Sequence, residues 1–148
     1  MFFKKQKALA IVAGCSRLGI SVAGELSSRG KSVIIIDING DSFTKLPHNY
    51  SGFTLEGDAT DISILKEAGI DEADIVLAAT DNDNVNIMIS EISSKIFDVE
   101  KVISRLYDTE KESIYKGFDI QIIYPSKLSI QEFNKLSVLP CKKDKEEE

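Results

Sequence analysis

The sequence predicts an α/β fold: a Rossmann-like, doubly wound and mainly parallel six-stranded sheet with helices on both faces. Two observations carry this prediction. Short apolar runs of strand length alternate along the chain with segments whose apolar residues recur at helical spacing. Glycines and polar residues follow the carboxyl ends of the apolar runs, where a parallel sheet binds its ligands.

The first strand, turn, helix and second strand form the clearest part of the pattern. Residues 8–13 are an apolar run suited to a buried strand, and the glycine turn 14–19 follows directly. Apolar residues then recur at helical spacing up to Gly30, and a second apolar strand, residues 32–36, ends on Asp37. This is the layout of a nucleotide-binding βαβ unit, with helix N–H groups for a phosphate and a carboxylate for the ribose. The alternative is a βαβ unit with an ordinary glycine turn and a solvated carboxylate.

The residues of the glycine turn have separate predicted roles. Gly14 permits the tight turn, and Gly19 lets the helix pack closely on the strand. Ser16 replaces the middle glycine of G-x-G-x-x-G; its Cβ narrows the phosphate cradle, and its hydroxyl is a candidate donor to phosphate. Arg17 is a candidate partner of a terminal phosphate, because a guanidinium binds two phosphate oxygens at once. Cys15 is either a small residue that fits the turn or a thiolate activated by the helix N-terminus.

The rest of the chain continues the alternation of strands and helices. Further strands are predicted at residues 53–55, 73–79, 101–106 and 120–124, and helices at residues 62–68, 85–97 and 109–116. We therefore divide the chain into a nucleotide-binding domain over residues 1–125, a C-terminal amphipathic helix over residues 126–140 and a charged, disordered tail over residues 141–148. The C-terminal helix is expected either to pack on its own sheet or to serve in dimerisation.

Candidate ligand contacts cluster where the predicted strands end. They are Asp37, Asn39, Asp58, Ala59, Thr80, Asp81, Asn82 and Arg105, the last of which sits late in the fifth strand. Asp58 is either an acceptor for the adenine amino group or a ribose, or a turn aspartate that bonds to its own backbone. The oxygen-rich loop 81–84 lacks the ordered ligand set that calcium needs, so we expect a solvated turn with a helix cap and no metal site.

Composition excludes several other classes of protein. The chain has 148 residues, of which 43% are hydrophobic and 28% charged, as in an ordinary globular domain. Its net charge of −6 argues against a nucleic-acid binder, which needs a basic surface. No apolar run approaches the ~20 residues of a membrane span, so no direct membrane insertion is expected. Two cysteines make no disulfide framework and the N-terminus has no signal-peptide core, which predicts a cytoplasmic location.

One pair of residues raises the possibility of catalysis. Tyr107 and Lys111 have the Tyr-x-x-x-Lys spacing of short-chain dehydrogenases, in which the tyrosine acts as general acid. Here the pair spans a predicted strand end and the start of a short helix, whereas in those enzymes it lies on one long helix. We therefore expect no catalytic residues and no enzyme. A small NAD-dependent oxidoreductase is the alternative, and a structural subunit without ligand binding is a third hypothesis.

Several short blocks in series resemble one family. They are Gly14–Gly19, Ile36–Asn39, Gly57–Asp61, Ala68–Ile70, Ala73–Asp74, Ala78–Asp81, Asn86 and Ser104–Asp108. Together they resemble the TrkA N-terminal domain, also called the RCK or KTN domain (regulator of potassium conductance). The resemblance covers about residues 8–125, and the Gly-Asp-Ala-Thr-Asp block is its most specific part.

The resemblance implies a cytosolic regulatory subunit, peripheral at the inner face of the cell membrane through its partner. Members bind NAD(H) or an adenine nucleotide (AMP, ADP or ATP), assemble as homodimers or rings, and gate the membrane subunit of a potassium channel or transporter. The phosphates would be lined by Gly14, Ser16, Arg17 and Gly19. Asp37 would hold the ribose with Asn39 nearby, and adenine would be bordered by Asp58 and Ala59. Thr80 would lie along the rim of the ligand site, and Arg105 would face phosphate or a dimer partner. The candidate set is completed by Cys15, Leu18, Ile38, Gly57, Ala79, Asp81 and Asn82.

The chain departs from the family pattern in two ways. Family members usually have glycine where this chain has Ser16, which makes AMP, ADP or ATP a competitor of a full dinucleotide. Full-length members often carry a further C-terminal ligand domain, whereas only a short segment follows Pro125. The chain is therefore expected to be a bare regulatory domain that pairs with another subunit.

Overall fold

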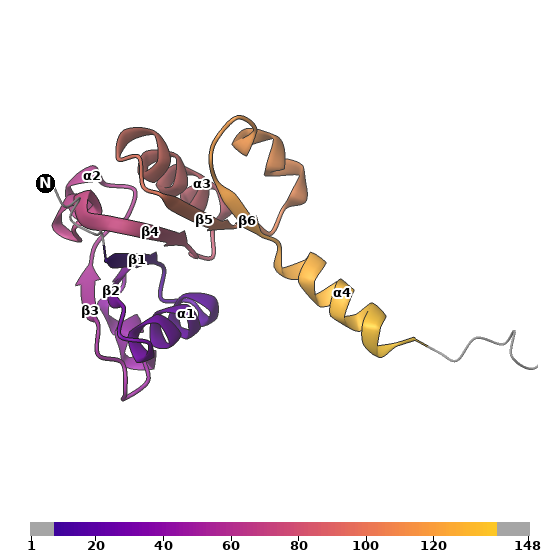
Figure 1. The fold of residues 1–148 in the computed structure, drawn as a ribbon, viewed down its shortest axis with the longest axis horizontal. Coiled ribbons are helices and arrows are strands. Elements are labelled where there is room, and N and C mark those ends of the chain that lie inside the picture. Colours follow the sequence, from indigo (N-terminus) through magenta and orange to yellow (C-terminus); the bar gives the residue numbers. More distant parts are fainter. Residues whose placement is uncertain (1–7, 139–148) are drawn as a thin grey trace, which may run out of the picture.

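The computed structural model describes residues 8–138, which form one six-stranded sheet with every strand pair parallel. Strand order is β3-β2-β1-β4-β5-β6, so the direction of winding reverses between β1 and β4 (Figure 1). The strands are β1 (Leu9–Ala13), β2 (Ser32–Asp37), β3 (Phe53–Glu56), β4 (Ala73–Ala78), β5 (Lys101–Arg105) and β6 (Gln121–Ile123). The predicted fold class is confirmed, and the sheet is wholly parallel.

Helices cover both faces of the sheet (Figure 1). On one face lies α1 (Arg17–Ser28), and on the other lie α2 (Ile62–Glu67) and α3 (Asp83–Glu91). The shorter helical segments are the 3-10 turns η1 (Gly40–Lys45), η2 (Ile70–Glu72) and η4 (Thr109–Tyr115) and the π-helical turn η3 (Ile92–Ile96). The helix predicted over residues 85–97 is thus α-helical only as far as Glu91, and the one predicted over 109–116 is a 3-10 turn.

The four inner strands, β1, β2, β4 and β5, are buried on both faces, which explains why they are continuous apolar runs instead of alternating ones. Ile11 and Ile36 pack on the side of α2 and α3, whereas Val12 and Ile35 pack on the side of α1. Two layers of packing therefore hold the strand ends, and with them the polar rim at their carboxyl ends.

Gly14 is the residue on which the turn between β1 and α1 depends. Its φ of +109° is disfavoured for any residue with a Cβ. A Cβ at this position would also lie 2.7 Å from the carbonyl oxygen of Ala79, beyond the end of β4. The turn therefore passes directly against the end of β4, at the reversal of strand order.

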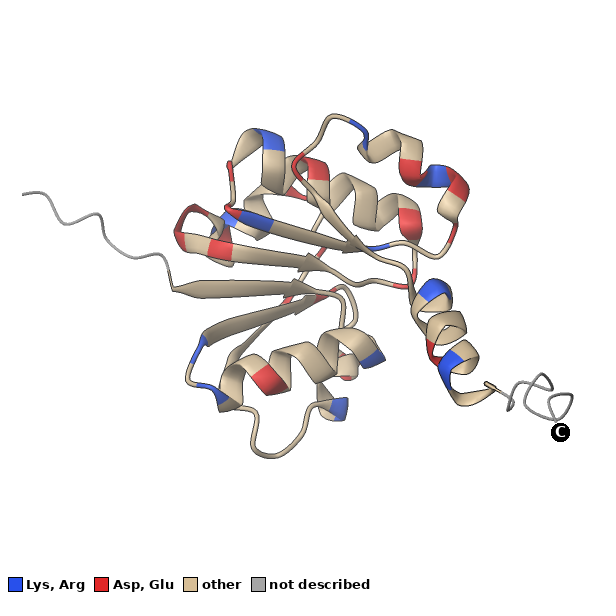
Figure 2. Ribbon diagram, turned by 45° about the vertical axis from the view of Figure 1, so that its right-hand side comes forward, with Lys and Arg blue, Asp and Glu red and all other residues tan. Residues whose placement is uncertain are grey.

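The C-terminal helix α4 (Pro125–Leu136) leaves the end of β6 and extends away from the sheet (Figure 1). None of its residues is buried, and Phe133 is 67% exposed. Figure 2 shows that only a small part of the helix carries charged residues. The predicted tail at residues 141–148 lies outside the described residues.

Candidate functional site

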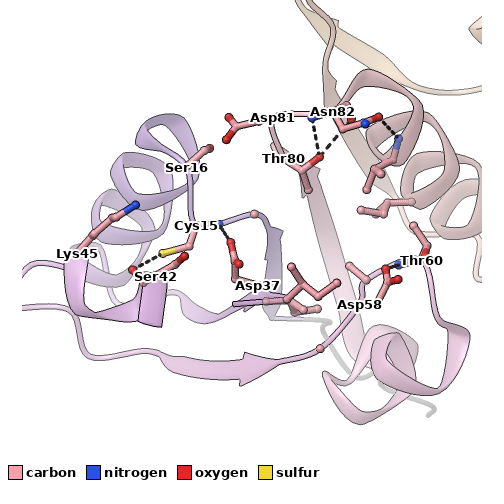
Figure 3. A pocket seen from close by; sticks show the side chains of 17 residues that line it. Cys15, Ser16, Asp37, Ser42, Lys45, Asp58, Thr60, Thr80, Asp81 and Asn82 are labelled. Atoms are coloured by element: carbon pink, nitrogen blue, oxygen red, sulfur yellow. Dashed lines mark hydrogen bonds between the residues drawn. The ribbon is translucent and has the colours of Figure 1, made fainter. Parts of the chain in front are cut away.

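A cleft of about 380 Å³ lies at the carboxyl ends of β1, β2, β3 and β4 (Figure 3). It brings together most of the residues predicted to bind a ligand, although they come from four separate turns. The predicted residues that line it are Gly14, Cys15, Ser16, Asp37, Ile38, Gly57, Asp58, Ala59, Thr80, Asp81 and Asn82. The reversal of strand order thus produces a concave site where the sequence predicted one.

The remaining predicted residues lie outside this cleft. Leu18 packs in the core beneath α1, and Gly19 is buried. Asn39 caps η1, because its side-chain oxygen accepts from the N–H of Asp41 at 3.1 Å. Ala79 is buried, and Arg17 and Arg105 line a second cleft of about 510 Å³ that adjoins the first.

Asp37 is held in a defined orientation at the end of β2. One carboxylate oxygen accepts from the backbone N–H of Cys15 at 2.8 Å, and the other accepts from the N–H of Asn39 at 2.8 Å. A carboxylate oxygen has two lone pairs, so each of these oxygens retains acceptor capacity toward the cleft. The geometry differs from that of a freely solvated aspartate and suits the recognition of two neighbouring ribose hydroxyls.

Ser16 caps α1 and also bridges to the neighbouring strand end. Its Oγ accepts from the N–H of Gly19 at 3.1 Å and donates to the carbonyl oxygen of Ala79 at 2.6 Å. In this structure the hydroxyl proton is directed at a backbone carbonyl and not into the cleft, so the predicted donation to phosphate would require that bond to break. Within the described residues the N–H groups of Arg17 and Leu18 are left free at the start of the helix, as an anion site requires.

Cys15 is a buried thiol that fits the turn. Its Sγ donates to the carbonyl of Ser42 at 3.2 Å. Burial raises the pKa of the Cys15 thiol, the charge of Asp37 raises it further, and Lys45 opposes the shift. The activated-thiolate alternative is therefore wrong, and the small-residue alternative is the one that the structure supports.

Lys45 is the residue of the site that the sequence analysis missed. It lies at the end of η1 and lines both clefts, next to Ser42 and across from Asp58 and Thr60 (Figure 3). The available signal was Asn39, a capping residue directly after β2, which begins the short helix that carries the lysine to the cleft. The other unpredicted lining residues are Ile36, Ser42, Thr60, Val85 and Ile89.

Arg105 is 5% exposed, and one of its three guanidinium nitrogens, Nη2, is bonded to the protein, whereas Nε is buried without a partner. Nη2 donates to the carbonyls of Ala79 at 2.9 Å and Thr80 at 2.7 Å, and contacts a carboxylate oxygen of Asp81 at 3.2 Å. The ring of Tyr107 lies 4.8 Å from the guanidinium carbon. Arg105 therefore joins the ends of β4 and β5, with only its remaining edge toward the second cleft.

Two aspartates act on backbone N–H groups near the cleft. Asp58 accepts from the N–H and the hydroxyl of Thr60, at 2.9 and 2.6 Å. These bonds are those of a turn aspartate, and the Asp58 side chain also lines the cleft. Asp83, in the first turn of α3, accepts from the N–H groups of Tyr107 and Asp108, each at 2.9 Å. The loop before α3 is a helix cap, because Asn82 accepts from the N–H of Val85 at 3.1 Å.

Over residues 8–138 no group of histidine, cysteine and acidic side chains is placed to hold a metal ion.

Tyr107 and Lys111 do not form a catalytic pair. The Lys111 ammonium donates to the side-chain oxygen of Asn84 at 3.2 Å, and the Tyr107 ring stacks on Arg105. A tyrosine acting as general acid needs the lysine beside its hydroxyl. The spacing therefore arises by chance in this chain.

Comparison with known proteins assigns the family. The model of the TrkA-N domain matches residues 10–125. The chain belongs to the TrkA-N domain family. The recognition from sequence blocks is thereby confirmed. Among curated relatives of this TrkA-N domain, the Trk system potassium uptake protein TrkA of Streptomyces coelicolor is 33% identical over 113 residues, covering 76% of this chain and 51% of that protein.

A second relative, TrkA of Mycobacterium tuberculosis, is 31% identical over 121 residues, covering 80% of this chain and 54% of that protein. This chain thus spans about half the length of these two curated relatives.

Solved structures share the fold of this TrkA-N domain. The TrkA-N domain of the inner membrane protein ybaL from Escherichia coli superposes with a TM-score of 0.78 at 13% identity, covering 90% of this chain and 99% of that one. A structure described as GsuK bound to ADP gives a TM-score of 0.72 at 22% identity, covering 90% and 34%. The AMP-bound Kef C-terminal domain of Shewanella denitrificans gives 0.68 at 22% identity, covering 88% and 82%. Within residues 8–138 no helix is long and apolar enough to cross a membrane.

Proposed function

We propose that this TrkA-N domain is a nucleotide-binding regulatory module of potassium transport. The cleft binds an adenine nucleotide or NAD(H), and the bound ligand shifts the balance between two conformations that a potassium channel or transporter subunit senses. One observation carries the proposal: the fixed Asp37 carboxylate and the free N–H groups of Arg17 and Leu18 border the same turn. These are the acceptor that a ribose needs and the donors that a phosphate needs.

The relatives support the ligand class and the process. Curated relatives are described as Trk system potassium uptake proteins. Structures with the same fold are described as a GsuK channel bound to NAD, GsuK bound to ADP and a Kef domain in AMP-bound form. An adenosine phosphate is common to these ligands, and the cleft offers contacts to adenosine and phosphate.

The proposed role is regulatory binding without catalysis. A reaction would need an acid, base or nucleophile facing the ligand. Burial raises the pKa of Cys15, which lines the cleft, and Lys111 is engaged with Asn84. Asp37 also disfavours the 2′-phosphate of NADP by charge repulsion. We therefore place this chain among binding modules rather than oxidoreductases.

The proposal includes a partner and a location. The module would sit on the cytoplasmic side of the cell membrane, bound to a potassium-conducting membrane subunit, and would assemble as a homodimer or larger ring. The exposed apolar residues of α4, among them Leu128 and Phe133, supply a surface for a second copy. Acidic and basic residues are interspersed along the ribbon (Figure 2), and the chain carries a net charge of −6. We accordingly include no nucleic-acid partner.

The test is calorimetric titration of the purified protein with AMP, ADP, ATP, NAD and NADH. We expect at least one of them to bind, and Asp37→Ala to weaken that binding by about ten- to a hundredfold, since it removes two charge-assisted hydrogen bonds. Asp71→Ala, at an exposed aspartate in η2, is the matched control and is expected to bind as the unaltered protein does. Failure of every adenine nucleotide to bind at millimolar concentration would refute the proposal.

A further inference from the structure

The two halves of the rim differ in how many polar groups they leave for a ligand. A dinucleotide in a fold of this kind lies across the reversal of strand order, with one nucleoside over each half of the sheet. Both halves must therefore offer contacts if a dinucleotide is to gain from its second nucleoside. Here the half formed by β1, β2 and β3 is the more open one, whereas at the ends of β4 and β5, which border the second cleft, most backbone groups are bonded to the protein's own side chains.

The end of β4 has its polar groups satisfied internally. The Ala79 carbonyl accepts from Ser16 and Arg105, and the Thr80 carbonyl accepts from Arg105 and from Asn86 at 3.0 Å. The N–H of Thr80 donates to the Asn86 side chain at 2.9 Å. Neither residue retains the backbone donor or unshared carbonyl that a second nucleoside would use.

The end of β5 is closed in the same way. The Arg105 carbonyl accepts from Asn86 at 3.1 Å. The N–H groups of Tyr107 and Asp108, which follow the strand, both donate to the carboxylate of Asp83. Asn86 is 0% exposed and Asp83 is buried in α3, so the side chains that occupy these backbone groups are themselves largely shielded from solvent. A ligand could reach these groups only by displacing buried partners, which costs more than the new bonds return.

The open half presents the reverse situation. Asp37 faces the cleft with acceptor capacity left, and Arg17 and Leu18 offer free N–H groups. Lys45 and the Arg17 side chain add two cations beside the passage from the main cleft to the second one. These contacts suit a short phosphate chain that starts at the ribose and ends at the helix N-terminus.

Ser16 stands at the boundary between the halves. Its hydroxyl proton is committed to Ala79, so an approaching phosphate or ribose meets an oxygen lone pair and a Cβ instead of a donor or open space. The bond joins the turn after β1 to the end of β4, which is the line that the pyrophosphate of a dinucleotide must cross.

We infer that the ligand is an adenosine mononucleotide, AMP, ADP or ATP, and that Ser16 is a specificity-determining residue that disfavours NAD(H). This inference rests on the proposed function, because it names the ligand class of the same cleft. The adenosine occupies the main cleft with its ribose on Asp37. The phosphates point over the start of α1 toward Arg17 and Lys45, whereas a second nucleoside in the second cleft would find few unbonded backbone groups at the ends of β4 and β5.

Competitive calorimetry with ADP, ADP-ribose and NAD tests the inference, because all three share the adenosine and the diphosphate. In the unaltered protein ADP is expected to bind at least about tenfold more tightly than ADP-ribose or NAD. Ser16→Gly removes the bridge and the Cβ, and is expected to reduce that ratio severalfold by strengthening the binding of NAD. Ser28→Gly, at an exposed serine in the last turn of the same helix, is the control for a glycine in α1 and is expected to keep the ratio. Ser16→Ala removes the bridge while keeping the Cβ, and replaces Ser16→Gly if that variant does not fold.

The outcomes separate this inference from the proposed function. Equal or tighter binding of NAD by the unaltered protein would overturn the inference and leave nucleotide regulation standing. An unchanged ratio in Ser16→Gly and Ser16→Ala would overturn the role of Ser16. Absence of binding by all three ligands, and by AMP and ATP, would overturn both.

Discussion

At the scale of single residues, buried polar side chains hold the strand ends that form the rim. Asn86 lies on α3 with 0% exposure, and its amide bonds to the N–H and carbonyl of Thr80 and to the carbonyl of Arg105. A side chain that satisfies several buried backbone groups at once is costly to remove, because its partners cannot turn to water. Asn86 therefore stabilises the end of β4 against the end of β5.

We expect Asn86→Ala to lower the free energy of unfolding by about 2–4 kcal/mol, since it leaves buried backbone groups unpaired. Urea denaturation followed by circular dichroism measures the change. Asn84→Ala, on the exposed side of the same helix, is the matched control and is expected to change the free energy of unfolding by less than about 0.5 kcal/mol. Equal losses in the two variants would show that the buried network does not hold the rim.

Tyr50 makes folding sensitive to alkaline pH. Its hydroxyl donates to the carbonyl of Phe53 at 2.7 Å, and burial raises the pKa of Tyr50 from 10.0 to about 12, with a smaller contribution from Cys15. Between these values the unfolded chain loses the tyrosine proton while the folded chain keeps it. The stabilisation is therefore complete below pH 10 and is lost as the pH rises toward 12.

Tyr50→Phe has no proton to lose at this position, so its stability is expected to fall less steeply with alkaline pH. Urea midpoints measured between about pH 8 and about pH 11 give the slope for each variant. Tyr107→Phe, at an exposed tyrosine, removes the same hydroxyl outside the core and should retain the slope of the unaltered protein. A Tyr50→Phe slope equal to that of the unaltered protein would contradict the assignment.

At the scale of elements, α4 differs from the other three α-helices of the described chain. The helices α1, α2 and α3 each contribute buried residues to the sheet, whereas α4 contributes none and extends from β6 with Leu128, Ile130 and Phe133 exposed (Figure 1). A short helix with an exposed apolar surface gains little stability by itself. Contact with a second copy would bury that surface, in keeping with the proposed assembly.

We expect Phe133→Asp to weaken self-association by at least about tenfold, because it places a charge where an aromatic side chain would be buried. Sedimentation velocity over a range of protein concentrations measures the change. Asn134→Asp adds the same charge at the next position of the helix and is the matched control, with self-association expected to be unchanged. If Phe133→Asp associates as the unaltered protein does, α4 is not the contact between copies.

At the scale of the whole molecule, hydrogen bonds connect the cleft to the start of α4. Arg105 and Asn86 join β4 to β5, the N–H of Leu106 donates to the carbonyl of Ile123 in β6 at 3.0 Å, and α4 begins at Pro125. A nucleotide that moved the loop after β4 would therefore act on the strand that carries α4. In the proposed function the strength of this coupling equals the difference in nucleotide affinity between the two conformations.

The sequence by itself determined the wholly local features of this protein. Apolar runs too continuous for a half-exposed sheet, a glycine turn and an acid at the end of the second strand predicted a parallel α/β fold and the position of its cleft. These signals depend on backbone geometry and on the spacing at which apolar residues recur along the chain. Both are set by residues that are close in the sequence, so the sequence alone reveals them. Asp37 was found in this way, because its place follows from the strand that it ends.

Only the tertiary structure decided which hydrogen-bond partner each polar group of the rim has. Ser16 donates to Ala79, 63 positions away, and Arg105 bonds to carbonyls at the end of another strand, so neither side chain is as free as its place in the sequence suggested. Lys45 reaches the cleft only because η1 folds back over the turn after β1. Hydrogen-bond partners depend on which strands become neighbours, and that order arises from the packing of the whole sheet, not from any one segment.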